Sequence, residues 1–326
     1  MLVLSEEEIR EAISTRDALD AVAEGFAALA RGDARLPGVL YLDLTEFDGD
    51  VHVKGAHMKG ASHFAIKVAG GWYANPDRGL PVGQGMVLVF SAETGVPEAL
   101  LLDNGFLTDL RTGAAGAVAA RHLARDPLSR MAMVGAGLEA RFQLRALADV
   151  RELPPVAVWS RSPPTAAAYA EEMRAELGAD VSPEPDLQTA VRGADLVVTA
   201  TPSREPIVMA DWLAPGTHVT ALGADGPDKQ EIDVEILRRA DVLVADDPAQ
   251  CADKGEIHHG LEAGVITLDD VAAQLGDLVA GTRPGRTDDD QITVCDLTGV
   301  GVQDAAVAAV ALERALAAGA GRELPT

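Results

Sequence analysis

The feature that most constrains the fold is a glycine-rich turn between a short apolar run and a helix. Residues 131–134 are Met-Ala-Met-Val, and Gly135, Gly137 and Ala140 follow with the spacing G-x-G-x-x-A. In such a turn the first glycine permits the tight bend, the second lets the backbone approach a pyrophosphate, and the small third residue lets the helix pack on the strand. The helix N-terminus adds a positive dipole. We therefore predict that this turn, Leu138 included, binds a dinucleotide.

Downstream of the turn, short apolar strands alternate with helices, which is typical of a parallel sheet covered on both faces. The expected strands span residues 131–134, 156–159, 195–200, 218–222, 241–245 and 292–295. Upstream, two helices precede several strands, and an alanine-rich helix is expected at 113–125. We predict two α/β domains, with a Rossmann doubly wound parallel sheet over residues 121–300 and a second α/β domain formed by 1–120 and 301–326.

Composition limits the classes of partner and compartment. A formal net charge of −24 argues against nucleic-acid and anionic-membrane partners, and a solubility or salt adaptation would also produce it. No apolar run has membrane-spanning length and the N-terminus is acidic, so neither a transmembrane helix nor a signal peptide is expected. Two cysteines, Cys251 and Cys295, suit a reducing compartment, so we expect a cytoplasmic protein.

The end of the second strand of the β/α series bears on the choice of nucleotide. An acidic residue there would accept the ribose hydroxyls of NAD and repel a 2′-phosphate. This chain has Ser160, Arg161 and Ser162 instead, and a guanidinium flanked by hydroxyls suits a phosphate. These residues favour NADP(H). The alternative is an exposed loop arginine, with NAD(H) bound through other contacts.

Two cations stand out by their context. Lys67, one of only five lysines, lies in an apolar strand at 64–69, and Arg111 precedes the alanine-rich helix. A lysine and an arginine on rigid elements around a glycine-rich bend could clamp a carboxylate. The alternative is that Lys67 extends from a sheet edge and Arg111 caps a helix.

One acid follows the strand at 218–222. Asp225 lies in a Gly-Ala-Asp-Gly-Pro turn that begins at Gly223, at the sheet edge where open parallel sheets bind ligands. A general acid/base role is one interpretation of this position. The alternative is an Asx-turn before a helix near Glu231.

Several motifs occur in one order along the chain. They are Lys67, Asn75-Pro76, Gly79-Leu80-Pro81, Leu107-Thr108, Arg111-Thr112-Gly113-Ala114-Ala115, the Gly135 turn, Gly223-Ala224-Asp225 and Asp296-Leu297-Thr298-Gly299. Together they resemble the ornithine cyclodeaminase/mu-crystallin family over nearly the whole chain. That family includes cyclising deaminases, imine reductases, amino-acid dehydrogenases and a vertebrate lens and hormone-binding protein. The resemblance therefore implies the fold more narrowly than the reaction.

The resemblance also implies roles for single residues. Lys67 and Arg111 would bind the substrate carboxylate, Lys67 would be able to donate a proton, and Asp225 would be the general acid/base at the substrate amine. Lys67 and Asp225 are thus the expected catalytic residues. The other expected cofactor contacts are Arg111 and Thr112 at the phosphates, Thr201 and Ser203 at the ribose, Gly223, and Thr298 and Val300 beside the nicotinamide. The family also implies a homodimer, formed through the substrate-binding domain.

Lys54 is the informative departure from the family. Thirteen residues before Lys67, the ornithine-cyclising members have a glutamate, which suits a substrate with a second amine. A lysine would repel the distal ammonium of ornithine and attract a carboxylate. We therefore predict that Lys54 binds the substrate and that the substrate is the imine of a neutral or acidic amino acid, with iminosuccinate, which would give aspartate, as the sharpest candidate. The alternative is a strand lysine that faces solvent.

No metal site is expected. Glu256, His258 and His259 lie near Cys251, but adjacent histidines point in different directions and no CxxC motif supports them.

The first functional hypothesis is an NAD(P)H-dependent imine reductase or amino-acid dehydrogenase that acts on a small 2-imino or 2-amino acid. One alternative is a cyclodeaminase-type lyase that uses bound NAD catalytically. The other is a crystallin-like NADPH-binding protein without turnover.

Overall fold

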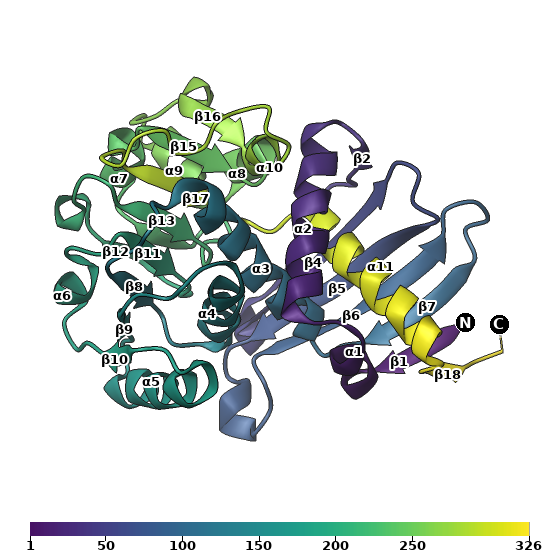
Figure 1. The fold of residues 1–326 in the computed structure, drawn as a ribbon. Coiled ribbons are helices and arrows are strands. Elements are labelled where there is room, and N and C mark those ends of the chain that lie inside the picture. The colour runs from purple at the N-terminus through teal and green to yellow at the C-terminus, as the bar shows by residue number, and fades with distance from the viewer. Residues whose placement is uncertain (326) are drawn as a thin grey trace. The chain divides into compact units, whose positions relative to one another are not determined.

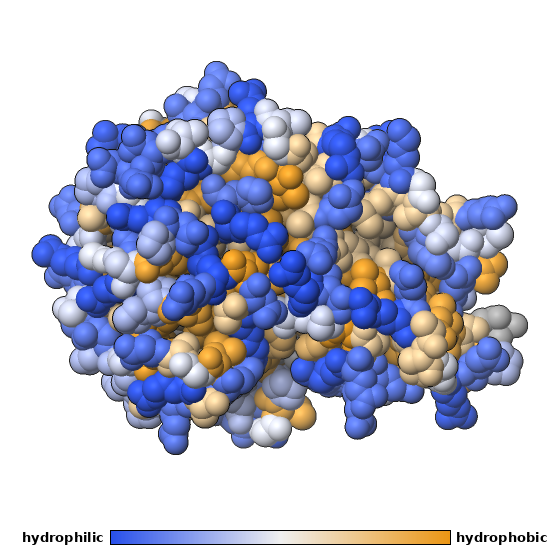
Figure 2. Space-filling view, in the orientation of Figure 1, coloured by the Kyte–Doolittle hydropathy of each residue, from blue (hydrophilic) through white to orange (hydrophobic). Residues whose placement is uncertain are grey.

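The computed structural model describes residues 1–325 and divides into two compact units. Unit 1 comprises Met1–Arg111 and the chain from Val300 on, and unit 2 comprises Thr112–Gly299. Both are α/β, and unit 2 has the Rossmann doubly wound sheet. The surface drawn in Figure 2 is mostly hydrophilic over both units, with smaller hydrophobic patches. No helix of the described residues is both long and apolar enough to cross a membrane.

Unit 1 contains a mixed sheet in which, among the strands of residues 1–325, only β1 and β7 pair in parallel. The strand order is β18 (Arg322–Glu323), β1 (Leu2–Ser5), β7 (Pro97–Leu102), β6 (Gly83–Ser91), β5 (His63–Trp72), β4 (Gly49–Met58) and β2 (Ala34–Arg35), and β3 (Leu40–Leu44) also pairs with β4. Short 3₁₀ helices η1 (Thr45–Phe47) and η2 (Asn75–Arg78) occupy two of its loops.

The helices of unit 1 are α1 (Glu6–Ala12), α2 (Thr15–Ala30), α11 (Gly301–Ala318) and the first residues of α3 (Phe106–Leu123). Ser5 and Ser14 form capping boxes that start α1 and α2. Helices α2 and α11 pack on each other, and α11 also packs on β4 and β5 (Figure 1). A side chain at Gly301 would clash with the Gly55 backbone, so this glycine lets the start of α11 approach β4 closely.

Unit 2 contains an all-parallel sheet. Its order is β10 (Val181–Pro183), β9 (Val156–Trp159), β8 (Met131–Val134), β11 (Leu196–Thr199), β13 (His218–Ala221), β17 (Thr293–Asp296), β15 (Val242–Ala245) and β16 (Val271–Gln274). The first strand in the sequence lies inside the sheet, which is the doubly wound arrangement. Strands β8, β11, β13, β15 and β17 are buried along their whole length, as expected of strands covered on both faces.

The remaining elements of unit 2 surround this sheet. They are the rest of α3, α4 (Leu138–Val150), α5 (Pro163–Leu177), α6 (Leu187–Val191), α7 (Val234–Arg239), α8 (Pro248–Asp253), α9 (Glu256–Glu262), α10 (Leu275–Val279), the 3₁₀ helices η3 (Ala210–Trp212) and η4 (Leu268–Asp270), and a parallel pair of β12 (Arg204–Val208) and β14 (Gln230–Ile232).

Two expectations about local structure were wrong. Arg111 and Thr112 lie inside α3 rather than before a helix that starts at Gly113, because α3 already begins at Phe106, where Asp103 accepts the Leu107 N–H (2.8 Å). Gly113 permits close packing, since a side chain there would clash with the Phe142 backbone. The second concerns the alternative for Asp225, since strand β14 comes between this turn and helix α7, which starts at Val234.

Candidate functional site

The glycine-rich turn has the geometry that a dinucleotide fingerprint requires. Gly135 has φ +114°, its N–H donates to the Trp159 carbonyl (2.9 Å), and a side chain there would clash with the Ala200 carbonyl. Only glycine fits this position. The turn therefore lies in backbone contact with the loop that follows β11.

The start of α4 is available to an anion. Gly137 is the N-cap, no side chain of the described residues caps the helix, and a Cβ at Gly137 would meet open space. Ala140 is fully buried, and its carbonyl accepts the Tyr169 hydroxyl (3.0 Å). Uncapped N–H groups at a helix N-terminus, with room for close approach, fit a pyrophosphate.

The loop after β9 carries the residues expected to select the nucleotide. The Ser162 N–H donates to Ser160 Oγ (3.3 Å), and Thr165 Oγ1 lies 2.9 Å from Ser162 Oγ. Arg161 is exposed between these serines. The loop is thus ordered by its own hydroxyl groups and presents a guanidinium to solvent.

Two loops at the carboxyl ends of the sheet are joined by Glu231, which sequence reasoning did not assign to the site. Its carboxylate accepts hydrogen bonds from Thr199 Oγ1 (2.7 Å), from the N–H and hydroxyl of Thr201 (2.6 and 2.7 Å), and from the Gly223 N–H (2.8 Å). Burial raises the pKa of Glu231 to about 7, and these hydrogen bonds oppose the rise.

Further acids are buried at the same sheet edge. Burial raises the pKa of Asp296 to about 8, and it also raises the pKa values of Asp246 and Glu256. Asp246 accepts hydrogen bonds from the Gly299 N–H (2.7 Å) and from Thr298 Oγ1 (3.0 Å). These carboxyl groups hold the loops that follow β15 and β17.

Asp225 is held by a basic residue four positions further along the chain. Lys229 Nζ lies 2.7 Å from Asp225 Oδ1, and His259 Nε2 donates to the Lys229 carbonyl (2.9 Å). The Asp225 side chain is 37% exposed, so a substrate amine could reach it. Gly223 must be glycine, because a side chain there would clash with the Thr201 backbone.

Unit 1 contains a buried cluster of cations around one acid. Asp304 Oδ1 lies 2.9 Å from Lys67 Nζ and 3.1 Å from Arg111 Nε, and the side chains of all three residues are at most 8% exposed. Burial lowers the pKa of Lys67, and the Asp304 charge opposes this. Burial would raise the pKa of Asp304, but the charges of Lys67, Arg111 and Lys54 outweigh burial and lower it.

Lys54 belongs to this cluster. It is 4% exposed, and in the β4–β5 ladder it lies directly opposite Lys67, so the alternative of a solvent-facing lysine is wrong. Lys67 lies on the internal strand β5, which also rules out a lysine at a sheet edge. Asp304 was not assigned to the site from the sequence. It is the only charged residue between Gly301 and Leu312, and a single charge in an apolar segment is also the signal that pointed to Lys67.

The residues near Cys251 do not form one group. Cys251 and Glu256 are buried and interact with the buried acid Asp296. The side chains of His258, His259 and Glu262 instead place atoms that could ligate a metal within 4.8 Å of one another. The Nδ1 of His258 donates to the Ala252 carbonyl (3.0 Å). That no metal binds here stays a prediction.

The structure brings together some of the predicted site residues within each unit. Lys54, Lys67 and Arg111 meet in unit 1, which also contains Val300. The Gly135 turn, Thr201 and Gly223 meet in unit 2. The other predicted residues of unit 2 are Thr112, Leu138, Ser160, Arg161, Ser162, Ser203, Asp225 and Thr298. Of these, Ser203 Oγ donates to the Glu205 carbonyl (2.6 Å).

The model of the ornithine cyclodeaminase/mu-crystallin family matches residues 1–319. This chain belongs to that family. Its relatives include an iminosuccinate reductase of Paracoccus denitrificans, 35% identical over 99% of both chains.

Two solved structures are closely similar over the full length. An archaeal alanine dehydrogenase dimer with bound NAD is 39% identical, with a TM-score of 0.93 over 100% of this chain and 99% of that one. The Δ1-pyrroline-2-carboxylate reductase of Thermococcus litoralis, in complex with NADH and L-proline, is 32% identical, with a TM-score of 0.95 over 99% and 100%. These relatives are reductases and dehydrogenases, and the two structures contain NAD or NADH.

Proposed function

We propose that this protein is an NAD(P)H-dependent imine reductase or amino-acid dehydrogenase that interconverts a small 2-imino acid and its 2-amino acid. The observation that carries the proposal is the buried Lys67–Asp304–Arg111 cluster with Lys54 beside it. Its cations outnumber the Asp304 carboxylate, so the cluster attracts an anion. The names of the relatives, an iminosuccinate reductase and an alanine dehydrogenase, support the same reaction class.

In the proposed reaction each unit has one task. Unit 1 is the substrate-binding and dimerisation domain, where Arg111 and Lys67 bind the substrate carboxylate. Unit 2 is the dinucleotide-binding domain, where the Gly135 turn and the start of α4 bind the pyrophosphate, and Thr112, Thr201, Ser203 and Thr298 make further contacts. A bound reduced nicotinamide would supply hydride to the imine carbon. Asp225 or Lys67 gives the proton that the imine nitrogen gains and takes it back in the reverse direction.

The substrate we favour is iminosuccinate. Lys54, Lys67 and Arg111 are all buried, and burial raises the pKa of Asp103, an acid that interacts with Lys67. The raised pKa disfavours the charged form of Asp103. Three cations around the Asp304 carboxylate suit a substrate with two carboxylates. The distal ammonium of ornithine would be repelled by Lys54.

The nucleotide we favour is NADPH, because Arg161 is exposed between Ser160 and Ser162 at the end of β9. This choice differs from the NAD and NADH named for the two solved structures. It depends on Arg161, and the ratio of Michaelis constants for NADPH and NADH tests it.

The homodimer is supported by exposed apolar side chains on unit 1. Leu40, Tyr41, Leu42 and Phe47 are between 45% and 60% exposed along β3 and η1. Clustered exposed apolar residues of this kind mark interaction sites. We expect light scattering to find a dimer, and Leu42→Glu to shift it toward monomer.

A spectrophotometric screen tests the proposed function. NADPH and NADH are each offered with oxaloacetate plus ammonia, pyruvate plus ammonia and Δ1-pyrroline-2-carboxylate, and ornithine is tested separately with NAD. We expect stoichiometric nucleotide oxidation with a 2-imino acid, fastest with iminosuccinate. Ammonia release from ornithine without net nucleotide turnover would indicate the lyase instead, and nucleotide binding without any turnover would indicate the non-enzymatic binder.

A further inference from the structure

Glu231 lies in β14, and its carboxylate reaches two separate loops at the carboxyl ends of the sheet. One oxygen, Oε1, accepts from the N–H and the hydroxyl of Thr201, in the loop after β11. The other, Oε2, accepts from Thr199 Oγ1 and from the Gly223 N–H, in the turn after β13. Glu231 is fully buried, so water does not compete for these bonds.

The loops joined by Glu231 are in close backbone contact. A side chain at Gly223 would clash with the Thr201 backbone, and a side chain at Gly135 would clash with the Ala200 carbonyl. The glycine-rich turn, the Thr201 loop and the turn that carries Asp225 therefore form one packed layer. A shift of any of these loops would move the other two.

We propose that Glu231 is a positioning residue that fixes the Thr201 loop and the Asp225 turn relative to each other, so that nucleotide binding and proton transfer occur in one geometry. This inference rests on the proposed function. Glu231 itself touches neither nucleotide nor substrate in this scheme. It acts through Thr201 on the nucleotide and through Gly223 on Asp225.

The chemistry requires a carboxylate rather than an amide at this position. Each Glu231 oxygen accepts one backbone N–H, from Thr201 on one side and from Gly223 on the other. A glutamine has only one oxygen, so its NH₂ group would face a backbone donor in either orientation. The hydroxyls of Thr199 and Thr201 can rotate, but a backbone N–H cannot. One loop must therefore move away in Glu231→Gln.

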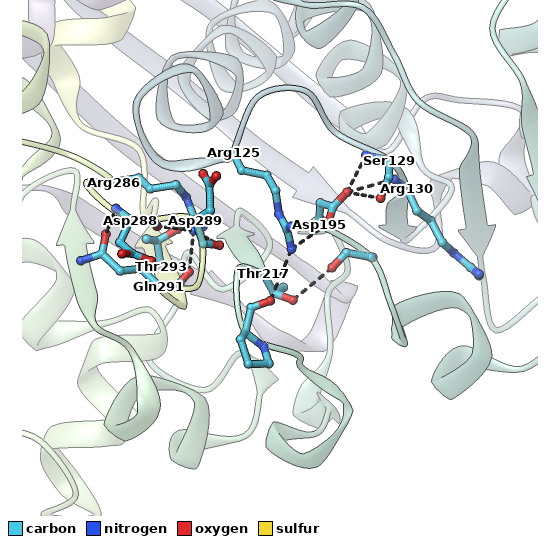
Figure 3. Close-up of polar contacts among 12 residues, drawn as sticks. Arg125, Ser129, Arg130, Asp195, Thr217, Arg286, Asp288, Asp289, Gln291 and Thr293 are labelled. Carbon is cyan, nitrogen blue, oxygen red and sulfur yellow. Dashed lines mark hydrogen bonds and ion pairs between the residues drawn. The ribbon is translucent and has the colours of Figure 1, made fainter.

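A matched control exists at the opposite edge of the same sheet. Asp195 is also buried and accepts from the Ser129 N–H, the Ser129 hydroxyl (2.6 Å) and the Arg130 N–H (3.2 Å), as Figure 3 shows. All three bonds go to Oδ2, and Oδ1 pairs with Arg125 (2.9 Å). Asp195→Asn thus makes the same carboxylate-to-amide change at the amino ends of the strands, where the amide oxygen can keep these three bonds and the ion pair with Arg125 is lost. Both variants should lower the melting temperature, and only Glu231→Gln should alter function.

The experiment compares the full-length wild type, Glu231→Gln and Asp195→Asn. For each protein, fluorescence titration gives the affinity for NADPH and NADH, and steady-state kinetics gives kcat and KM with the best imino acid of the screen. For Glu231→Gln we expect nucleotide affinity to fall about tenfold and kcat to fall about 10- to 100-fold. For Asp195→Asn we expect both within about twofold of wild type. Glu231→Gln with wild-type affinity and kcat would overturn the inference while leaving the proposed function intact.

A second pair of variants decides the matter if Glu231→Gln does not fold. Thr199→Val removes one donor to Glu231 without adding volume, and Thr199→Ser keeps that hydroxyl. We expect kcat to fall about three- to tenfold in Thr199→Val and to return to within about twofold of wild type in Thr199→Ser. Wild-type values in Thr199→Val, or no rescue by serine, would overturn the inference. A wild type that binds neither nucleotide would overturn the proposed function, and the inference with it.

Discussion

At the amino ends of the strands in unit 2 the loops are held mainly by arginines, one of them paired with the buried Asp195, whereas at the carboxyl ends they are held by several buried carboxylates. Figure 3 shows the amino ends, where Arg286 donates to the Gln291 carbonyl (2.6 Å) and to Thr293 Oγ1 (3.1 Å). Arg125 donates to the Pro215 carbonyl (3.3 Å) and forms an ion pair with Asp195 (2.9 Å). The arginines mainly satisfy carbonyl oxygens.

The carboxyl ends have the opposite arrangement. There Glu231, Asp246 and Asp296 accept backbone N–H groups, including those of Gly223, Gly299 and Ile257. An arginine stays charged at every physiological pH, but burial raises the pKa values of these acids toward neutrality. The carboxyl edge, where ligands bind in such folds, is therefore also the edge at which the charge of buried groups depends most on pH.

The largest expected difference between the two ends is in catalysis. Replacing Asp225 with Asn at the carboxyl end should lower kcat about 10²- to 10⁴-fold, because the amide cannot exchange the proton of the substrate nitrogen. Nucleotide affinity, measured by fluorescence titration, should not change. Wild-type turnover in Asp225→Asn would end the acid/base assignment.

The next effect concerns the nucleotide. Arg161 lies at the carboxyl end of β9, and Arg161→Ala should raise the KM for NADPH about tenfold. The KM for NADH should stay within about twofold of wild type, because only NADPH has the 2′-phosphate that a guanidinium can bind. Arg130→Ala, at the amino end, serves as the control and should change neither constant. An unchanged ratio in Arg161→Ala would show that the discrimination lies elsewhere.

The smallest expected effect is a shift of stability with pH. Asp296, with its pKa raised to about 8, contributes stability that is present below its ordinary pKa and is lost as the pH rises through 8. Asp195 has a lowered pKa, so its contribution is lost only in acid. The melting temperature of wild type should fall by several degrees between about pH 6 and about pH 8 and level off above it, because there Asp296 is ionised in both the folded and the unfolded state.

Variants separate the two acids in this measurement. Asp296→Asn should flatten the fall of melting temperature across that range, whereas Asp195→Asn should keep the wild-type slope. Equal slopes in wild type and Asp296→Asn would contradict the assignment of the pH dependence to the carboxyl end.

The two units also differ in how far the sequence predicts them. The central strands of unit 2 are short continuous apolar runs, and each boundary expected for β8, β9, β11, β13, β15 and β17 lies within one residue of the observed one. The N-terminal start of α3 was missed, because Asp103 caps it from outside the alanine-rich run. Strands β1 and β18 pair across nearly the whole length of the chain, and no local pattern reveals such a contact.

The site shows the same limit. Lys67 was found because a charge in an apolar strand is conspicuous, whereas Glu231 lies in a short polar segment with no periodicity. Its partners, Thr199, Thr201 and Gly223, come from two other loops, and only the fold brings them together. A buried hydrogen-bond acceptor of this kind cannot be predicted until its distant donors are placed.

The most direct test of the central claim is the Michaelis constant for the imino acid in Lys67→Met. The methionine removes the charge from the Asp304 cluster while keeping a side chain of similar length, so KM should rise about 10²-fold and nucleotide affinity should stay unchanged. Lys59→Met, an exposed lysine of the same unit, should behave like wild type. A Lys67→Met enzyme that keeps the wild-type KM would contradict substrate binding by this cluster.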